Sequence, residues 1–342
     1  MVVEEFFAQT RVFVVTGKGG VGKTTLSGAM ANLAARHGLS CLVVQMAAPG
    51  ASRPPETAHL SRLFGQDGVL DYEELVLKPL DGPEPAGQVR ARALRADTAL
   101  VEYLHAHGMK RLSRRLATSG ALDVVATAVP GMPDILVLGK LKQMERAAAA
   151  GQAGAPDVIV LDAPAAGHAV RFLQSPHGLL GAATGGPVRA QAEEVVAMLS
   201  DPTRCQVVLV TTPEETPVSE TVETAQALED KAGAALCTVV VNGRMPHLDL
   251  PADLCAEVLV GAAGRRGARL SEPGATELVA AAALRRARQR SEAAQVERLA
   301  AELPLPQLEL PFCFSTELGP AQLALLTDAL ESGLASWSPV RL

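Results

Sequence analysis

The sequence contains few cysteines, and their arrangement does not support metal–thiolate chemistry. The five cysteines are scattered, with no CxxC pair and no cluster with histidine, so neither a zinc nor an iron–sulfur site is indicated. Their odd number, and the position of three of them in or beside apolar runs, predict small reduced core residues rather than disulfides. The five are Cys41, Cys205, Cys237, Cys255 and Cys313.

The chain also lacks targeting signals and a strong charge of one sign. Its first five residues are acidic where a signal peptide would be basic, and no apolar run is long enough to span a membrane. Acidic and basic residues nearly balance, 37 against 31, so no basic field favours nucleic acid. We expect a cytoplasmic protein without an integral membrane segment or a nucleic-acid partner.

What is present near the start is an apolar strand that leads through a glycine-rich turn into a helix. After the run 11–16, four residues separate Gly17 from Gly22, Lys23 and Thr24. This spacing predicts a loop whose backbone N–H groups surround phosphate, with a lysine on the outer phosphates and a hydroxyl on Mg²⁺. Glycine permits positive φ and close approach of the anion. The predicted nucleotide-binding residues here are Gly17, Gly19, Gly20, Val21, Gly22, Lys23, Thr24 and Thr25.

Further apolar runs follow, separated by segments of helical periodicity. Uninterrupted apolar strands of this kind predict a parallel sheet covered on both faces. We therefore expect one α/β domain over residues 1–342, with a doubly wound, mostly parallel sheet flanked by helices. The predicted strands are 41–45, 156–162, 206–212, 236–242 and 307–310, and the predicted helices are 214–232, 272–303 and 320–334.

Residues 88–150 have a mainly helical pattern and are expected to form a helical layer within this domain. Apolar stripes include Leu94, Leu100 and Leu104 in one segment and Val137 and Leu141 in another, with a break at 130–133. The stripes fit ordinary core packing, and they also fit a layer that presents apolar surface to a client.

Asp162 ends the apolar strand 156–162 and is a candidate Mg²⁺ ligand together with Thr24. An acidic residue at this place in a phosphate-loop protein supports the metal, directly or through water. The residues after it predict a tight turn in which the N–H of Gly167 reaches the γ-phosphate and senses its loss. For His168 we favour a structural or coupling role over a catalytic one.

A second lysine, Lys18, makes the loop resemble the deviant Walker A loop of the MinD/ParA/ArsA-like ATPases. The segment 162–173 is similar to the switch segment of the ArsA family, and 129–134 and 212–217 are similar to further segments in that family's order. The resemblance implies an ATPase that binds Mg²⁺–ATP at a dimer interface. Lys18, Lys23, Asp162 and Gly167 would then be catalytic, with Lys18 acting on the partner's nucleotide. Asn242, Pro311 and Phe312 would bind the base side of the nucleotide.

The chain departs from that family in one important place. The stretch after the second strand carries Ala47 where the family has a water-positioning aspartate. Loss of such a group lowers rates by roughly 10²–10⁴-fold. The cysteines that bind zinc or arsenite in the family are also missing. Hydrolysis is therefore expected to be slow, to borrow a group from elsewhere, or to depend on a more active partner.

The favoured function is an ArsA-like ATPase that couples ATP binding and hydrolysis to the handling of a hydrophobic or membrane-related client. It would act as a homodimer or with an ArsA-like paralogue. The alternative is a weakly active nucleotide-binding regulatory subunit paired with such a paralogue. A MinD-type membrane anchor is disfavoured because the last helix has no Lys or Arg. An iron–sulfur reductase is disfavoured because residues 163–172 contain no cysteine.

Overall fold

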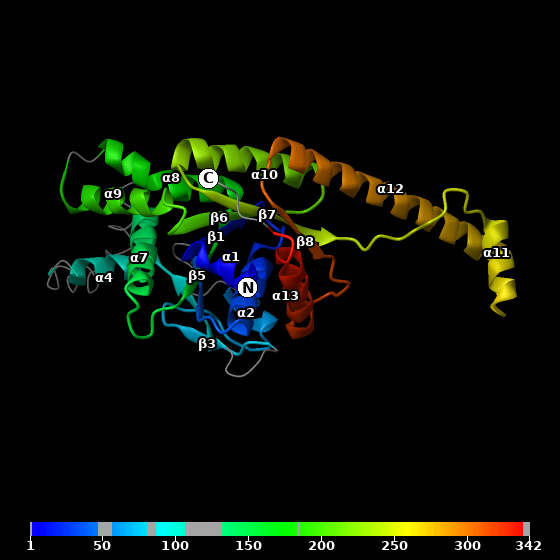
Figure 1. Ribbon diagram of the computed structural model, residues 1–342, viewed down its shortest axis with the longest axis horizontal. Coiled ribbons are helices and arrows are strands. Elements are labelled where there is room, and N and C mark those ends of the chain that lie inside the picture. Colours follow the sequence, from blue (N-terminus) through cyan, green and yellow to red (C-terminus); the bar gives the residue numbers. More distant parts are fainter. Residues whose placement is uncertain are drawn as a thin grey trace.

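The computed structural model describes residues 2–46, 57–80, 87–106, 108, 131–182 and 185–337. Within them the chain forms an eight-stranded sheet between two layers of helices (Figure 1). The strands are β1 (Val12–Gly17), β2 (Cys41–Met46), β3 (Leu75–Leu77), β4 (Val89–Leu94), β5 (Val158–Ala165), β6 (Cys205–Thr211), β7 (Leu236–Arg244) and β8 (Gln307–Pro311).

The strand order is β3-β4-β2-β5-β1-β6-β7-β8. All neighbours pair in parallel except β3, which runs antiparallel to β4 at one edge. The chain leaves the centre in opposite directions from β1 and β5, and ligands of open α/β sheets bind at such a reversal. This doubly wound α/β fold and all six strands expected from the apolar runs are confirmed.

The apolar strands are central because both of their faces are covered. Every residue of β1 is buried, as is every residue of β6. In a parallel sheet with helices on both sides, both sets of alternating side chains face the core. The helices that cover the sheet are α1 (Val2–Ala8), α2 (Lys23–Arg36), α3 (Thr57–Leu63), α4 (Ala96–Ala106), α7 (Met132–Ala149), α8 (Ala166–Ala182), α9 (Pro187–Leu199), α10 (Glu215–Ala227) with the π-helical turn η1 (Leu228–Ala232), and α13 (Pro320–Leu334).

Two apolar cores lie on opposite faces of the sheet. One joins α1, α2, α3 and α13 to the sheet and includes the stacked rings of Phe6 and Phe13, whose centroids are 5.0 Å apart. The other core joins the helices α7, α8, α9 and α10 to the opposite face of the sheet. In Figure 1 the helices α8 and α10 lie on one side of the strands, and α2 and α13 lie on the other.

The expectation of helix from residue 88 onward is wrong for its first part. Residues 89–94 form β4, whose sequence alternates Arg90 and Arg92 with small or apolar residues, a period of two that suits a strand. Leu94 therefore belongs to β4, while Leu100 and Leu104 lie on α4 in a small cluster that packs on α7. The apolar stripe of α7 is buried in the core, which is the ordinary-packing interpretation. Residues 109–130 lie outside the described part.

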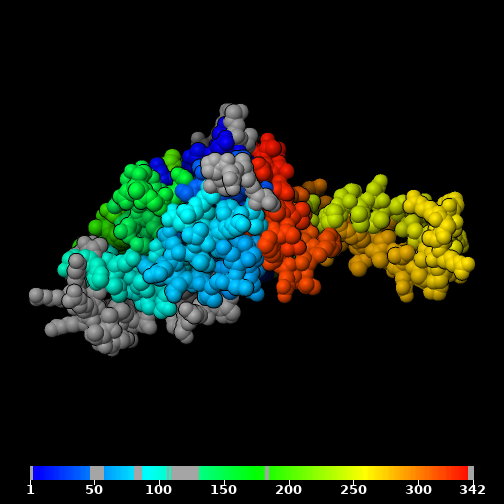
Figure 2. Space-filling model, turned by 90° about the horizontal axis from the view of Figure 1, so that it is seen from below, coloured from blue at the N-terminus to red at the C-terminus, as the bar shows by residue number. Residues whose placement is uncertain are grey.

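A long helical hairpin projects from this body beyond the end of β7. It consists of α11 (Ala256–Arg265) and α12 (Glu272–Glu302), the latter matching the predicted helix. Figures 1 and 2 both show the far end of this hairpin standing clear of the rest of the molecule. No residue of α11 is buried. We call residues 245–302 the arm.

Among the described residues, none of the helices combines the length and apolarity that crossing a bilayer requires. Three cysteines, Cys41, Cys205 and Cys237, are buried in strands, and burial raises the pKa of the Cys205 thiol to about 12. The expectation of unpaired core cysteines is confirmed for these three, whereas Cys255 is exposed and Cys313 is half-buried.

The first testable prediction concerns Asn32, a buried amide that links α2 to its surroundings. It donates to Thr327 Oγ1 of α13 at 3.1 Å and accepts from the backbone N–H of Leu80 at 2.8 Å. Asn32→Ala leaves these groups unpaired, so we expect it to lower the free energy of unfolding by about 2–3 kcal/mol. Urea denaturation measures this. Thr327→Val, which spares the Leu80 contact, should have a smaller effect, and an equal effect would contradict the assignment.

Candidate nucleotide-binding site

The predicted phosphate loop lies between β1 and α2 at the carboxyl edge of the sheet. Gly20 and Gly22 have φ values of 86° and 98°, a region that L side chains rarely adopt. Gly22 is also the N-cap of α2 and has no side chain with which to cap the helix. The first N–H groups of α2 have no intrahelical acceptor and face the loop, which suits an anion.

Two glycines are also required by close packing. A Cβ built on Gly17 would lie 2.1 Å from the carbonyl oxygen of Val210, and one on Gly22 would lie 2.3 Å from Nδ2 of Asn242. Both contacts are far too short. The loop thus packs tightly against residues of β6 and β7, and a side chain at either glycine would displace it.

Lys23 extends across the loop. Its Nζ donates to the carbonyl oxygen of Lys18 at 3.1 Å, so the ammonium group closes the ring of backbone formed by residues 18–23. Burial lowers the pKa of Lys23, and the nearby charge of Asp162 opposes that shift. A partly desolvated cation in this position has few water molecules to lose when it meets phosphate.

Asp162 meets the loop as predicted. Thr24 Oγ1 donates to its Oδ2 at 2.6 Å, and the sheet register pairs Asp162 with Val15 of β1 on one side and Gln45 of β2 on the other. The side chain is buried, and burial raises the pKa of its carboxyl, while the hydrogen bonds and Lys23 oppose the shift. A hydroxyl and a carboxylate this close present the hard oxygen ligands that Mg²⁺ prefers.

Two further residues at this point were not expected from the sequence. Gln45 Nε2 donates to the same Oδ2 of Asp162 at 2.8 Å, and the imidazole of His59 on α3 is close enough for Asp162 to raise its pKa, although burial lowers it more strongly. A glutamine in an otherwise apolar strand is the sequence signal that could have marked Gln45. No comparable signal marks His59.

Lys18 contacts its own chain. Its Nζ lies 2.6 Å from Oε1 of Glu220 on α10, and both side chains are about a third exposed. The resemblance to the deviant Walker A loop implies that Lys18 acts on a partner's nucleotide, and this ion pair with Glu220 is not expected from it. For Lys18 to reach outward, the contact with Glu220 has to break.

The tight turn predicted after Asp162 is wrong. Strand β5 continues to Ala165 and α8 begins at Ala166, which places Gly167 in the first turn of a helix. Gly167 is exposed, and a Cβ built on it meets no atom within 4 Å. Its N–H is nonetheless one of the free donors at a helix N-terminus. His168 is exposed as well.

Of the three residues predicted for the base side, Asn242 and Pro311 lie on the last two strands, and Phe312 directly follows the last one. Asn242 Nδ2 donates to the carbonyl oxygen of Val21 at 2.8 Å and so supports the loop directly. Pro311 ends β8, and the ring of Phe312 packs beside Gly243, with 3.9 Å to a Cβ built there. Phe312 and Phe314 form an edge-to-face pair that is 41% and 73% exposed. Ala47 lies outside the described residues.

A glycine loop between a central parallel strand and a helix, facing an aspartate on the neighbouring strand, defines the P-loop class of nucleoside triphosphatases. Within this class the chain belongs to the ArsA ATPase family. It matches the model of that family, described as anion-transporting ATPases, over residues 10–182. This segment contains the loop, Asp162 and α8, and it ends before the arm.

Comparison with curated proteins agrees. The ATPase BagA of Mycobacterium tuberculosis is 35% identical over 248 residues, which cover 71% of this chain and 68% of that protein. A putative arsenical pump-driving ATPase of Halobacterium salinarum is 28% identical, over 70% of this chain and 36% of that one. The ATPase GET3C of Arabidopsis thaliana is 27% identical, over 49% and 42%. Family and relatives together support an ATPase function and nucleotide binding.

We predict that Asp162→Asn has opposite effects on the stability of the fold and on Mg²⁺-dependent nucleotide binding. Because the pKa of the folded carboxyl is raised above its ordinary 3.8, wild-type stability falls as pH rises through the raised pKa. Asparagine keeps an acceptor for Thr24 but carries no charge. Without nucleotide or Mg²⁺, the variant should therefore gain stability relative to the wild type as pH rises, as urea denaturation across pH can measure. Its Mg²⁺-dependent nucleotide affinity should fall. A relative stability that shrinks with pH would contradict this account.

Proposed function

We propose that this protein binds Mg²⁺–ATP in the loop of residues 17–25 and hydrolyses it in a dimer, and that it couples nucleotide state to the handling of a hydrophobic or membrane-associated client. The single observation that carries the nucleotide site is the hydrogen bond of 2.6 Å between Thr24 and Asp162. It brings the helix N-terminus and a carboxylate of β5 together at the place where the metal would bind.

Each residue of the nucleotide site would have its own binding role. Backbone N–H groups of the loop and of α2 would hold the phosphates, and Lys23 would contact their outer oxygens. Thr24 and Asp162 would hold Mg²⁺, which when bound supplies charge stabilisation for phosphoryl transfer. Gly167 would donate its N–H toward the γ-phosphate. Pro311 and Phe312 would line the base side beside Asn242.

The dimer proposal rests on Lys18. Its side chain leaves the loop and reaches Glu220, at the accessible edge of the site. Exchange of this exposed ion pair for a partner's phosphate is energetically easy, because exposed pairs contribute only about 0–1 kcal/mol. The same lysine could therefore stabilise charge on a second copy's nucleotide, as a finger residue does.

A mixing experiment tests whether Lys18 acts across the dimer. Lys23→Ala should lose nucleotide binding, whereas Lys18→Ala should bind nucleotide normally and hydrolyse it roughly 10²-fold or more slowly. In a mixture of the two variants, the Lys23→Ala subunit still carries Lys18 and should restore phosphate release by its partner. Glu220→Gln is the matched control, since it frees Lys18 without removing it. Absence of rescue would place Lys18 in its own site.

A second candidate function is favoured by Ala47, where the sequence lacks a water-positioning carboxylate. The chain would then be a nucleotide-binding regulatory subunit that pairs with an ArsA-like paralogue. The two functions differ in turnover by the purified chain. Robust phosphate release that depends on Lys23 supports the enzyme, and tight nucleotide binding without release supports the regulatory subunit.

The client proposal draws support from relatives such as the one named as driving an arsenical pump. We predict that a labelled, 20-residue apolar helical peptide binds the full chain at least about tenfold more tightly with a non-hydrolysable ATP analogue than with ADP. Fluorescence anisotropy measures the difference. A peptide of equal length with two central lysines is the control, and Lys23→Ala should abolish the nucleotide effect. Equal affinity in both nucleotide states would overturn the coupling.

A further inference from the structure

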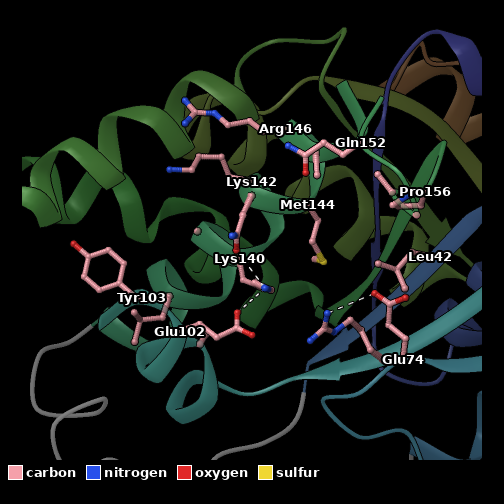
Figure 3. A pocket seen from close by; sticks show the side chains of 18 of the residues that line it. Leu42, Glu74, Glu102, Tyr103, Lys140, Lys142, Met144, Arg146, Gln152 and Pro156 are labelled. Atoms are coloured by element: carbon pink, nitrogen blue, oxygen red, sulfur yellow. Dashed lines mark hydrogen bonds and ion pairs between the residues drawn. The ribbon is translucent and has the colours of Figure 1, made fainter. Parts of the chain in front are cut away.

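A cavity of about 880 Å³ lies between β4, α4 and α7, apart from the glycine loop (Figure 3). Neither the loop nor Asp162 contributes to its lining. Leu42, Leu136 and Met144 give it apolar walls. In Figure 3 the side chains of Glu74 and Glu102 approach it from different sides. Its volume is in the range of small-molecule sites.

One buried cation in this cavity makes no hydrogen bond to the part of the chain that the structure describes. Arg92 lines the cavity and is only 9% exposed. Its guanidinium lies 4.4 Å from the ring centre of Tyr72 and 3.6 Å from a carboxylate oxygen of Glu74, and its buried Nε has no partner among the described residues. Arginine has five N–H donors, and burial of such donors without acceptors is costly.

The neighbouring Arg90 makes hydrogen bonds that Arg92 lacks, although its buried Nε also has no partner among the described residues. Arg90 lies two residues earlier on the same face of β4, and it donates to Glu74 at 2.7 Å and to the carbonyl oxygen of Gly154 at 2.9 Å. Arg90 therefore takes the better contact with Glu74. Arg92 is left with the longer one.

The charges around the cavity repeat this imbalance. Glu194 is shared by Lys142 and Arg146, and Glu102 pairs with Lys140 at 2.5 Å. Among the residues that line the cavity, four cations face three carboxylates, namely Arg92, Lys140, Lys142 and Arg146 against Glu74, Glu102 and Glu194. The cavity thus combines apolar walls with an excess of positive charge.

We propose that this cavity binds a small molecule that carries one anionic group, a carboxylate or a phosphate, on an apolar body. The guanidinium of Arg92 holds the anion, since its planar fork matches either group in a bidentate fashion. Leu42, Leu136 and Met144 contact the apolar body. This site is independent of the nucleotide site.

A purely structural role for Arg92 makes a different prediction. A buried arginine that holds the fold together has its donors paired, and its loss destabilises the protein. Arg92 has no hydrogen bond to another described residue that its replacement would remove, and the apolar Leu42 lines the same cavity. Arg92→Leu should therefore leave the melting temperature unchanged or raise it.

Isothermal titration of the full chain with octanoate, octyl phosphate and octanamide tests the site. We expect one or both anions to bind saturably and the uncharged amide not to bind, and the two anions tell a carboxylate site from a phosphate site. Arg92→Leu should weaken anion binding by roughly 10- to 100-fold. Arg269→Leu, at an exposed arginine on the arm, should have no effect.

Glu74→Gln gives a second test with the opposite sign. It removes the carboxylate that competes for Arg92 while keeping the side-chain size, so anion affinity should rise. The proposal is overturned if neither anion binds, if octanamide binds as well as octanoate, or if Arg92→Leu binds unchanged. It is equally overturned if Glu74→Gln leaves the anion affinity the same or lowers it. The Glu74→Gln measurement tests the proposal even if Arg92→Leu fails to fold.

Discussion

The geometry of the nucleotide site depends on one oxygen atom. Oδ2 of Asp162 accepts hydrogen bonds from Thr24 and from Gln45, and so connects the start of α2, the end of β5 and the end of β2. These elements are distant in sequence, and the sheet alone would not fix the rotation of α2 relative to β5. A carboxylate in a buried setting remains charged only where donors and cations surround it. The loop supplies them, and in return it is held in the shape that phosphate requires.

The sequence carries most of this arrangement because its signals are local or topological. A run such as 12–17 that is apolar at every position suits only a strand covered on both faces, and the carboxyl ends of parallel strands share one edge. The meeting of Thr24 and Asp162 follows from these two facts. The contact between Asn242 and the loop follows in part, because β7 ends at the same edge.

Other contacts depend on information that no local pattern holds. Gln45 reaches Asp162 because β2 is inserted next to β5, and Glu220 reaches Lys18 because α10 returns beside the loop. Both depend on which elements become neighbours. Strand β4 is a different case, because the alternation of Arg90 and Arg92 with small or apolar residues is itself a local strand pattern. What this pattern does not show is that the fold turns Arg92 toward a covered face of the sheet.

Two buried charges in this protein therefore represent opposite solutions. Around Asp162, hydrogen-bond donors and a lysine of its own chain oppose the rise in pKa that burial causes. Arg92 has little more than an aromatic ring and a distant carboxylate that a neighbouring arginine contacts more closely. The first pattern belongs to a site that must keep its shape before its ligand arrives. The second belongs to a site whose last partner comes from outside.

The length of the arm means that a small motion at its base, near the nucleotide site, would become a larger motion at its far end. Helix α12 has 31 residues, which at a rise of 1.5 Å each makes a rod of about 46 Å. Near its base, Arg298 donates to the carbonyl oxygen of Glu215 and to Ser219, both on the helix that also carries the partner of Lys18. If this rod pivots at its base by about 5°, its far end moves by roughly 4 Å. Because the base of the arm is bonded to α10, any tilt of that helix would produce a larger displacement at the tip of the arm.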